Sequence, residues 1–213
     1  MIIAPYGESG IRIVFGSAID LNVHERVRKC FQFLVDNDFP YVVDIIPAFC
    51  SCVILFDDER ISLEGFSSFL LEKKDVMLQA RLSEPVTHSI PVRYGDEWGP
   101  DLDFVCLHTG HTREEVIRIH TATPYTVFAV GFIPGFAYLG PLDQRLYAPR
   151  LKTPRVRVPA GSVGIALNQT GIYPFDSPGG WQLIGWSGIK LFDKERAPFG
   201  LLRMGDRVRF VRE

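Results

Sequence analysis

The sequence predicts two parts, an α+β part over residues 1–84 and a mainly β part over residues 85–213. In the first part, short β-type runs occur in pairs, and each pair precedes a stretch with apolar residues at helical spacing. Beyond His120, short β-type runs alternate with Gly and Pro, which is typical of a barrel or a sandwich. The length of 213 residues suits one large domain or two small ones.

The first part repeats the order strand, strand, helix. The runs IIAPYG and IRIVF precede a helical pattern that begins near Asp20, a residue type that caps helices. The runs YVVDIIPAF and SCVILFD precede a second helical pattern, from Ser62 to Ala80. This order predicts a small ββαββα-like domain whose helices cover one face of an antiparallel sheet.

The second part begins near Pro85 with one clear helix signal. Thr112 and Glu115 have the spacing of a capping box before an apolar helical run. The runs TVFAVGF, GSVGIAL, WQLIGW and RVRFV follow as strands.

Composition excludes several classes of protein. A net charge of -2 gives no basic surface for nucleic acid or an anionic membrane. The uncharged stretch from Thr121 to Leu142 is interrupted by Pro and Gly, so it does not predict a membrane helix. The first ten residues lack the pattern of a signal peptide, and the four cysteines form no Cys-x-x-Cys pair. We therefore expect a soluble, cytoplasmic protein.

The common catalytic motifs are missing. There is no Gly-x-x-x-x-Gly-Lys phosphate loop and no Gly-x-Ser-x-Gly nucleophile motif. His108 and His111 have no further metal-ligand residues at a suitable spacing, so we expect no metal site. The catalytic residues stay unassigned at this point.

Three stretches carry candidate site residues. The first is GFIPGFAYLG, in which Phe132, Pro134, Phe136 and Tyr138 could wall a pocket or fill the end of a barrel. The second is basic: Arg150, Arg155 and Arg157 alternate with prolines along an extended segment. Arginine forks suit a carboxylate or phosphate, so this segment is either an anion site or a solvated basic edge.

The third stretch, Val158 to Ile189, contains Asp176 as its one charged residue. Such a stretch is either buried or covered by a partner. Its candidate ligand-binding residues are polar groups and glycines, namely Gln169, Thr170, Tyr173, Ser177, Gly179 and Gly180.

Together these stretches resemble a known family. GFIPGFAYLG and the string YAPRLKTPRVRVPAGSVGIALNQTGIYPFDSPGGWQLIG are similar to the signature of the B-type subunits of 5-oxoprolinase, a family also called kinase-A inhibitor-like or allophanate hydrolase subunit 1. PVRYGDEWGPDLDFV and GESGIRIVFG extend the resemblance over nearly the whole chain. The sequence departs from the family at Trp186-Ser187, where relatives carry a polar pair such as Arg-Thr.

The resemblance implies a fold and a function. It implies a cyclophilin-like β-barrel in the second part and a small α/β domain in the first. It also implies a bacterial hetero-oligomeric hydrolase that opens 5-oxoproline to glutamate with ATP, in which this chain is a subunit that is inactive alone. The implied partners are a paralogous C-type subunit and a lactam-utilisation-type A subunit. Two alternatives stay open: an inhibitor that binds a sensor histidine kinase, and a subunit of a urea- or allophanate-type carboxyltransferase.

Overall fold

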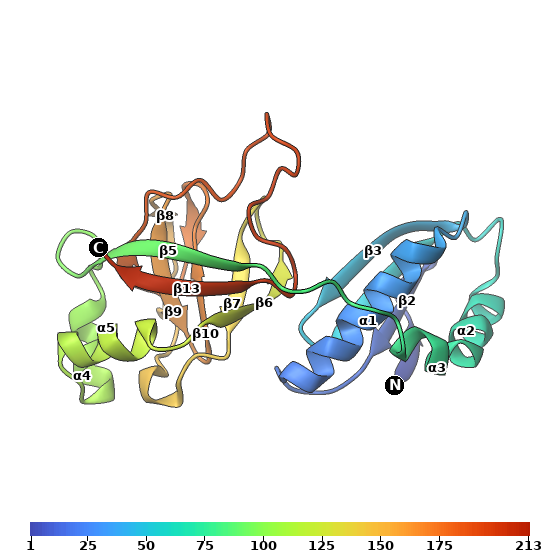
Figure 1. Cartoon of the computed structure of the whole chain (residues 1–213), viewed down its shortest axis with the longest axis horizontal. Helices are drawn as coiled ribbons and strands as arrows, with labels where there is room; N and C mark the ends of the chain where they lie inside the picture. The colour runs from blue at the N-terminus through green and yellow to red at the C-terminus, as the bar shows by residue number, and fades with distance from the viewer. The chain divides into compact units, whose positions relative to one another are not determined.

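The structure, a computed structural model, describes every residue from Met1 to Glu213. The chain forms two compact units, Met1–Glu84 and Pro85–Glu213 (Figure 1). Each unit has apolar clusters made of its own residues. That the two units fold independently stays a prediction.

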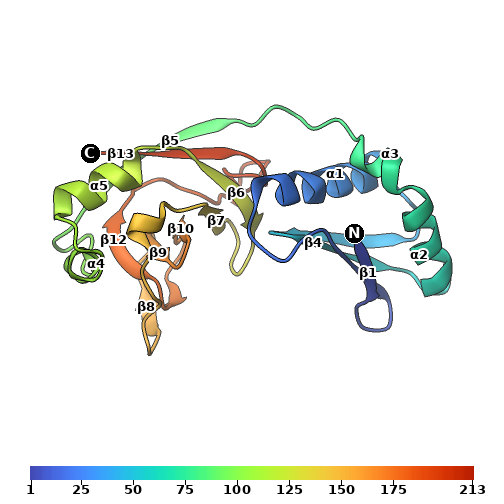
Figure 2. The same ribbon diagram turned by 90° about the horizontal axis from the view of Figure 1, so that it is seen from below.

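The first unit is built on a four-stranded antiparallel sheet with the order β1-β2-β4-β3. Side chains alternate along β2, where Ile11 and Ile13 are fully buried and Arg12 is exposed. One face of the sheet is therefore covered, and Figure 2 shows α1 lying across it. The observed element order matches the expected pairs of strands followed by helices. The strands are β1 (Ile2–Pro5), β2 (Gly10–Val14), β3 (Val42–Ala48) and β4 (Ser51–Phe56).

The helices of this unit begin where capping residues stand. α1 (Leu21–Asn37) starts after Asp20, whose carboxylate accepts the N–H groups of Asn22 and Val23 at 2.9 and 3.0 Å. The expected single helix from Ser62 to Ala80 is wrong. It is divided into α2 (Leu63–Glu72) and α3 (Lys74–Leu78), because Lys73 leaves the helical conformation with φ -82° and ψ 4°.

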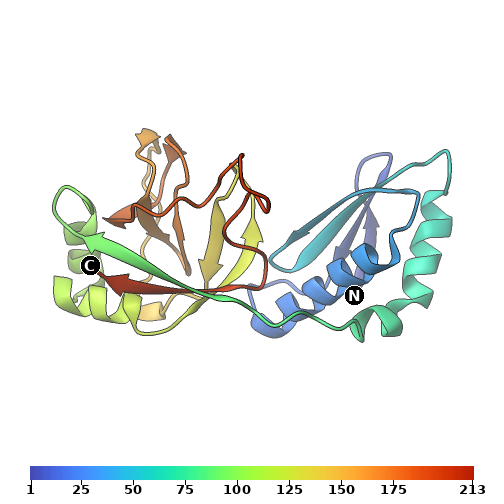
Figure 3. The same cartoon turned by 45° about the horizontal axis from the view of Figure 1, so that its top comes forward.

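The second unit contains a closed barrel with the strand order β10-β7-β6-β13-β5-β12-β9. The expectation of a barrel is confirmed, and the sandwich alternative is excluded. β5 and β13 run parallel and side by side, as Figure 3 shows, whereas the other neighbouring strands are antiparallel. The strands are β5 (Thr87–Tyr94), β6 (Tyr125–Val130), β7 (Ala137–Gly140), β9 (Ser162–Ala166), β10 (Gln169–Ile172), β12 (Gln182–Trp186) and β13 (Arg207–Arg212).

Three short helices pack beside the barrel. α4 (Leu102–Thr109) lies against β12, and α5 (Arg113–Thr121) lies against β13. The 3-10 helix η1 (Gln144–Leu146) contacts both α4 and α5. The capping box is confirmed. The Thr112 N–H donates to Glu115 Oε2 at 2.8 Å, and the Glu115 N–H donates to Thr112 Oγ1 at 3.3 Å.

A separate two-stranded ribbon completes this unit. It pairs β8 (Arg155–Val158) with β11 (Ser177–Gly179) outside the barrel. β8 has a strand neighbour on one side only, which suits a segment flanked by Pro154 and Pro159. None of the helices combines the length and the apolar composition that crossing a bilayer requires.

Candidate functional site: an aromatic pocket on the barrel wall

The outer face of the barrel carries a second apolar cluster. Along β9, Ile165 belongs to the barrel core and its neighbour Ala166 belongs to this other cluster. Leu183 and Ile184 of β12 divide in the same way. Because successive residues of a strand point to opposite faces, the second cluster lies on the outside of the barrel wall. Its buried members are Phe136, Val158, Ala166, Tyr173, Trp181 and Leu183.

Phe136 is the centre of an aromatic group within this cluster. Its ring meets four other rings edge-on, with centroid distances of 4.9 to 5.7 Å. This edge-to-face geometry is the one that aromatic quadrupoles favour. The four rings are those of Phe132, Tyr138, Tyr173 and Trp181.

Gly171 makes room for this arrangement. A Cβ at this position would lie 2.9 Å from the Ala137 carbonyl oxygen and 3.1 Å from the Trp181 ring. Any larger residue at position 171 would therefore crowd both the backbone of β7 and the Trp181 ring.

These rings form one side of an open pocket of about 250 Å³. The ribbon of β8 and β11, with the turns beside it, forms the other side. Arg150 supplies the single charged side chain of the lining. The pocket is lined by Phe132, Phe136, Tyr138, Arg150, Pro154, Tyr173, Pro178, Gly179, Gly180 and Trp181.

The ribbon is held in place by two arginine–carboxylate pairs. Arg155 Nη2 lies 2.6 Å from Asp101 Oδ1, and the same carboxylate accepts the Leu183 N–H at 2.6 Å. Arg157 Nε lies 2.7 Å from Asp176 Oδ2. The first pair is partly buried and ties β8 to the barrel, whereas the second is exposed and closes the ribbon on itself.

The two tyrosines of the pocket are neutral hydroxyls. Burial raises the pKa of Tyr138 and of Tyr173, and the nearby positive charge of Arg150 opposes part of that rise in both. The Tyr173 hydroxyl is hydrogen-bonded to the backbone of Trp181. Both side chains can therefore offer a hydroxyl group, but not a phenolate, at neutral pH.

The structure brings together only part of the predicted site. Seven of the candidate residues line the pocket: Phe132, Phe136, Tyr138, Arg150, Tyr173, Gly179 and Gly180. The other candidates lie outside its lining: Pro134, Arg155, Arg157, Gln169, Thr170 and Ser177.

The arginine interpretation changes most. Arg155 and Arg157 belong to the segment that was expected to be either an anion site or a solvated basic edge, and each is paired with a carboxylate of this chain. The arginine that lines the pocket is Arg150 instead. Sequence reasoning could not distinguish the three, since the acidic partner of Arg155 lies 54 residues away along the chain.

The uncharged stretch has a structural explanation over β10. All four residues of this strand are buried in the barrel wall, including Gln169 and Thr170. Ser177 is also buried, and its Oγ has no hydrogen-bond partner. Lack of charge in this stretch therefore reflects burial in the strands, and pocket lining from Tyr173 to Trp181.

The sequence did not indicate that His120 is buried and hydrogen-bonded through both ring nitrogens. His120 Nδ1 lies 2.7 Å from the Tyr94 hydroxyl, and its Nε2 lies 2.9 Å from Thr170 Oγ1. Thr170 donates its own proton to the Gly164 carbonyl, so it accepts the Nε2 proton and Tyr94 donates to Nδ1. Burial lowers the pKa of His120 to about 3, so the imidazole is neutral. A histidine at the end of a helix gave no sequence signal for this role.

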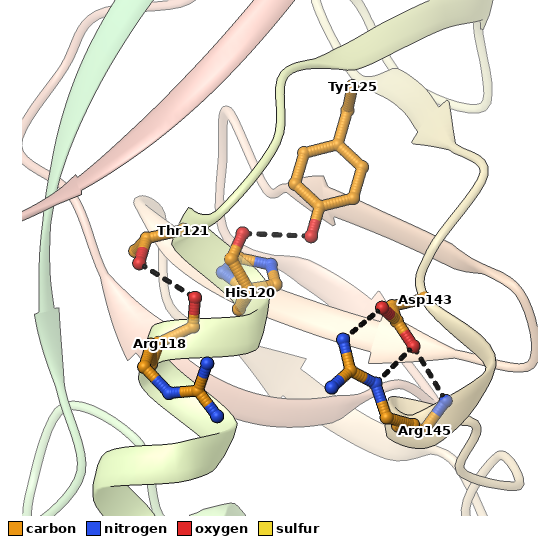
Figure 4. Close-up of polar contacts among 6 residues, drawn as sticks. All are labelled: Arg118, His120, Thr121, Tyr125, Asp143 and Arg145. Carbon is orange, nitrogen blue, oxygen red and sulfur yellow. Dashed lines mark hydrogen bonds and ion pairs between the residues drawn. The ribbon is translucent and has the colours of Figure 1, made fainter.

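Further contacts hold the chain around His120 in place. Its backbone carbonyl accepts the Tyr125 hydroxyl at 2.8 Å, as Figure 4 shows. In the same view Asp143 accepts two bonds from the guanidinium of Arg145, which helps to lower the pKa of Asp143 to about 2. None of these residues lines the pocket, so the network is part of the barrel's framework.

The chain matches known proteins along nearly its whole length. Residues 1–202 match the family described as "Carboxyltransferase domain, subdomain C and D". The chain belongs to this family. Within it, the B-type subunit of 5-oxoprolinase from Bacillus subtilis is 42% identical, covering 97% of this chain and 90% of that protein. The corresponding 5-oxoprolinase subunit of Escherichia coli O157:H7 is 41% identical, covering 96% and 93%.

Solved structures agree with the fold. The structure of TTHA0988 superposes with a TM-score of 0.84 at 35% identity over 96% of this chain. The present chain spans only 40% of that longer chain. The urea amidolyase of Kluyveromyces lactis has a TM-score of 0.81 at 20% identity, which shows a shared fold.

The family's matched segment contains the whole aromatic pocket. The departure at Trp186-Ser187 lies outside the pocket lining. There the Trp186 indole N–H donates to the Ala160 carbonyl at 2.8 Å, and its ring packs against Trp98. Trp186 therefore holds the turn before β9, and neither residue of the pair belongs to the pocket lining.

Proposed function

We propose that this chain is a non-autonomous subunit of an ATP-dependent 5-oxoprolinase, which opens 5-oxoproline to glutamate. The observation that carries this proposal is the 42% identity to the B-type subunit of a 5-oxoprolinase over nearly the full length of both chains. The remaining subunits would be a paralogous C-type chain and a lactam-utilisation-type A chain.

The chemistry explains why ATP is needed. The amide of an unstrained lactam is a poor electrophile. Transfer of the γ-phosphoryl group of ATP to the lactam oxygen releases ADP and converts that oxygen into a leaving group. Water then adds to the activated carbon, and the ring C–N bond breaks to give a free amine and an acyl phosphate. A second water molecule hydrolyses the acyl phosphate and releases glutamate and phosphate.

Several features support a subunit rather than a complete enzyme. The sequence has no phosphate loop, and no described group of His, Cys, Asp and Glu side chains could hold a metal ion. The pocket contains one charged residue, Arg150, and no carboxylate or histidine that could act as a general base. The nucleotide and the acid–base groups would therefore come from the partner subunits.

The direct test is reconstitution. Purified chain, alone and mixed with its A- and C-type partners, is incubated with 5-oxoproline and ATP, and glutamate is measured. We expect glutamate from the mixture and none from this chain alone. Steady glutamate release by the isolated chain would refute the proposed dependence on partners. A mixture that forms a complex but releases no glutamate would refute the proposed reaction.

A carboxyltransferase-type subunit is the second candidate. It is favoured by the family to which residues 1–202 belong and by the fold shared with a urea amidolyase. The same reconstituted mixture can be assayed with urea and a carboxylated biotin carrier. Carboxyl transfer to urea, in the absence of 5-oxoproline cleavage, would decide for this alternative.

A further inference from the structure

The pocket contains a residue that stability alone does not explain. Phe132 has a φ of 76°, in the left-handed region where a side chain is disfavoured by roughly 1–2 kcal/mol. Its side chain gains little from burial, because 60% of the residue is exposed. Glycine would adopt this conformation without strain. The phenyl ring is therefore positioned at the pocket at a cost to the fold, which is the pattern expected of a ligand contact.

Arg150 is the second pocket residue whose position stability does not explain. Three other arginines in this region, Arg145, Arg155 and Arg157, each hold a carboxylate of the chain. No salt bridge of the structure involves Arg150, although this residue lines the pocket. Its charge reaches both tyrosines, which places it beside the aromatic group. A cation without an internal partner, beside apolar walls, is suited to an anionic ligand.

The size and lining of the pocket define the class of ligand. A volume of about 250 Å³ is below the roughly 300–1,000 Å³ that is usual for drug-sized molecules. Aromatic walls favour a compact apolar ring. A single guanidinium matches one carboxylate through two parallel hydrogen bonds, whereas a phosphate group usually has several donors or cations around it.

We propose that the aromatic pocket binds a compact ring that carries one carboxylate, with Arg150 as the counter-ion and Phe132 against the ring. The choice of 5-oxoproline as the probe rests on the proposed function. The pocket itself does not, because all its lining residues belong to the Pro85–Glu213 unit. The unassembled full-length chain is therefore expected to bind the probe.

The test uses NMR of the full-length chain, in which three tryptophans give three indole N–H signals. Trp181 lines the pocket, while Trp98 and Trp186 lie outside its lining and contact each other with their ring planes tilted by 36°. We expect 5-oxoproline to shift the Trp181 signal saturably and to leave the other two in place. Absence of a saturable shift, or equal shifts of all three signals, would overturn the proposal.

Related probes separate the parts of the ligand. Cyclopentanecarboxylate keeps the ring and the carboxylate and should bind. 2-Pyrrolidinone keeps the lactam ring but lacks the carboxylate, so it should bind at least tenfold more weakly. Inorganic phosphate tests the other source of negative charge and should not shift the Trp181 signal. Equal binding of 2-pyrrolidinone, or binding of phosphate at the affinity of 5-oxoproline, would contradict a carboxylate site.

Variants assign the roles of the two residues. Arg150→Gln should weaken 5-oxoproline binding about ten- to hundredfold, since a charge-assisted hydrogen bond is lost. Lys152→Gln removes the same charge two residues away, outside the pocket lining, and should leave binding unchanged. Equal losses in both variants would indicate a general charge effect and overturn the assignment of Arg150.

Phe132→Gly is the sharpest variant. We expect binding to weaken by about tenfold while the thermal midpoint stays the same or rises, because the left-handed backbone strain is removed. A lower thermal midpoint with unchanged binding would make Phe132 a packing residue and contradict the proposal.

The assembled complex distinguishes this inference from the proposed function. Glutamate release that is unaffected by Arg150→Gln, with no probe binding, would refute the pocket assignment and leave the proposed function intact. Arg150-dependent binding in a complex that releases no glutamate would support the pocket and refute the proposed function.

Discussion

Asp101 is the residue whose removal should most clearly detach the ribbon from the barrel wall. Its Oδ1 is 2.6 Å from Arg155 Nη2, and its Oδ2 accepts the Leu183 N–H at 2.6 Å. Only 12% of the Asp101 side chain and 29% of the Arg155 side chain are exposed. Asp101→Ala therefore leaves the Leu183 N–H without its acceptor, and leaves Arg155 with only a long hydrogen bond of 3.4 Å to the Trp181 carbonyl, in a mostly dry environment.

The magnitude follows from these two contacts. A hydrogen bond to a charged group contributes roughly 1.5–3 kcal/mol, and a buried N–H left unpaired costs roughly 1–3 kcal/mol. We discount the pair with Arg155 for its partial exposure and expect Asp101→Ala to lower the free energy of unfolding by about 3 kcal/mol. For a unit of this size that corresponds to a shift of the thermal midpoint on the order of 10 °C.

Asp103 provides a matched control. It pairs with Arg113 at 2.6 and 2.7 Å, yet its side chain is 70% exposed and that of Arg113 is 46% exposed. Asp103→Ala should lower the free energy of unfolding far less than Asp101→Ala does, because solvent screens an exposed pair.

Urea unfolding followed by tryptophan fluorescence measures this difference in the right unit, because Trp98, Trp181 and Trp186 all belong to Pro85–Glu213. Equal costs for Asp101→Ala and Asp103→Ala would show that burial does not determine the strength of the Asp101 contacts. A double-mutant cycle with Arg155→Ala should give a coupling of about 1 kcal/mol or more.

Three further predictions concern the framework. Because burial holds the pKa of His120 near 3, well below its unfolded value of 6.5, stability should be full above pH 6.5 and fall by about 1 kcal/mol per pH unit toward pH 3. His120→Gln should flatten that part of the profile, and an unchanged slope in urea titrations would assign it to other groups. Gly171→Ala should destabilise the barrel, whereas Gly180→Ala, where the nearest atom lies 3.6 Å away, should not; similar thermal midpoints would contradict this. A fragment of residues 85–213 should give the circular dichroism of a folded barrel, and an unfolded fragment would refute independent folding.

Local chemistry determined most of the fold. Alternating apolar runs gave the strands, because one buried face of a strand requires every second residue to be apolar. The cap at Asp20 and the capping box at Thr112 and Glu115 could also be predicted from the sequence, because each cap accepts hydrogen bonds from N–H groups within three residues. Several short strands with frequent turns predicted a barrel or a sandwich, and the strand pairing of the tertiary structure decided for the closed barrel.

The sequence by itself also singled out the three stretches whose residues line the pocket. The aromatic residues near Phe136, the basic segment and the uncharged stretch do meet at one pocket. What it could not determine was which side chain faces the cavity. That depends on partners distant in the chain, such as Asp101 for Arg155 and Tyr94 and Thr170 for His120.

Only the tertiary structure shows which arginines are paired with carboxylates of the chain and which one is not. Arginines of one segment cannot be distinguished by sequence position. The fold distinguishes them by bringing carboxylates beside some of them, because the attraction between two charges depends on their distance in space. Asp101 and Asp176 neutralise Arg155 and Arg157, and Arg150 is left to face the aromatic pocket.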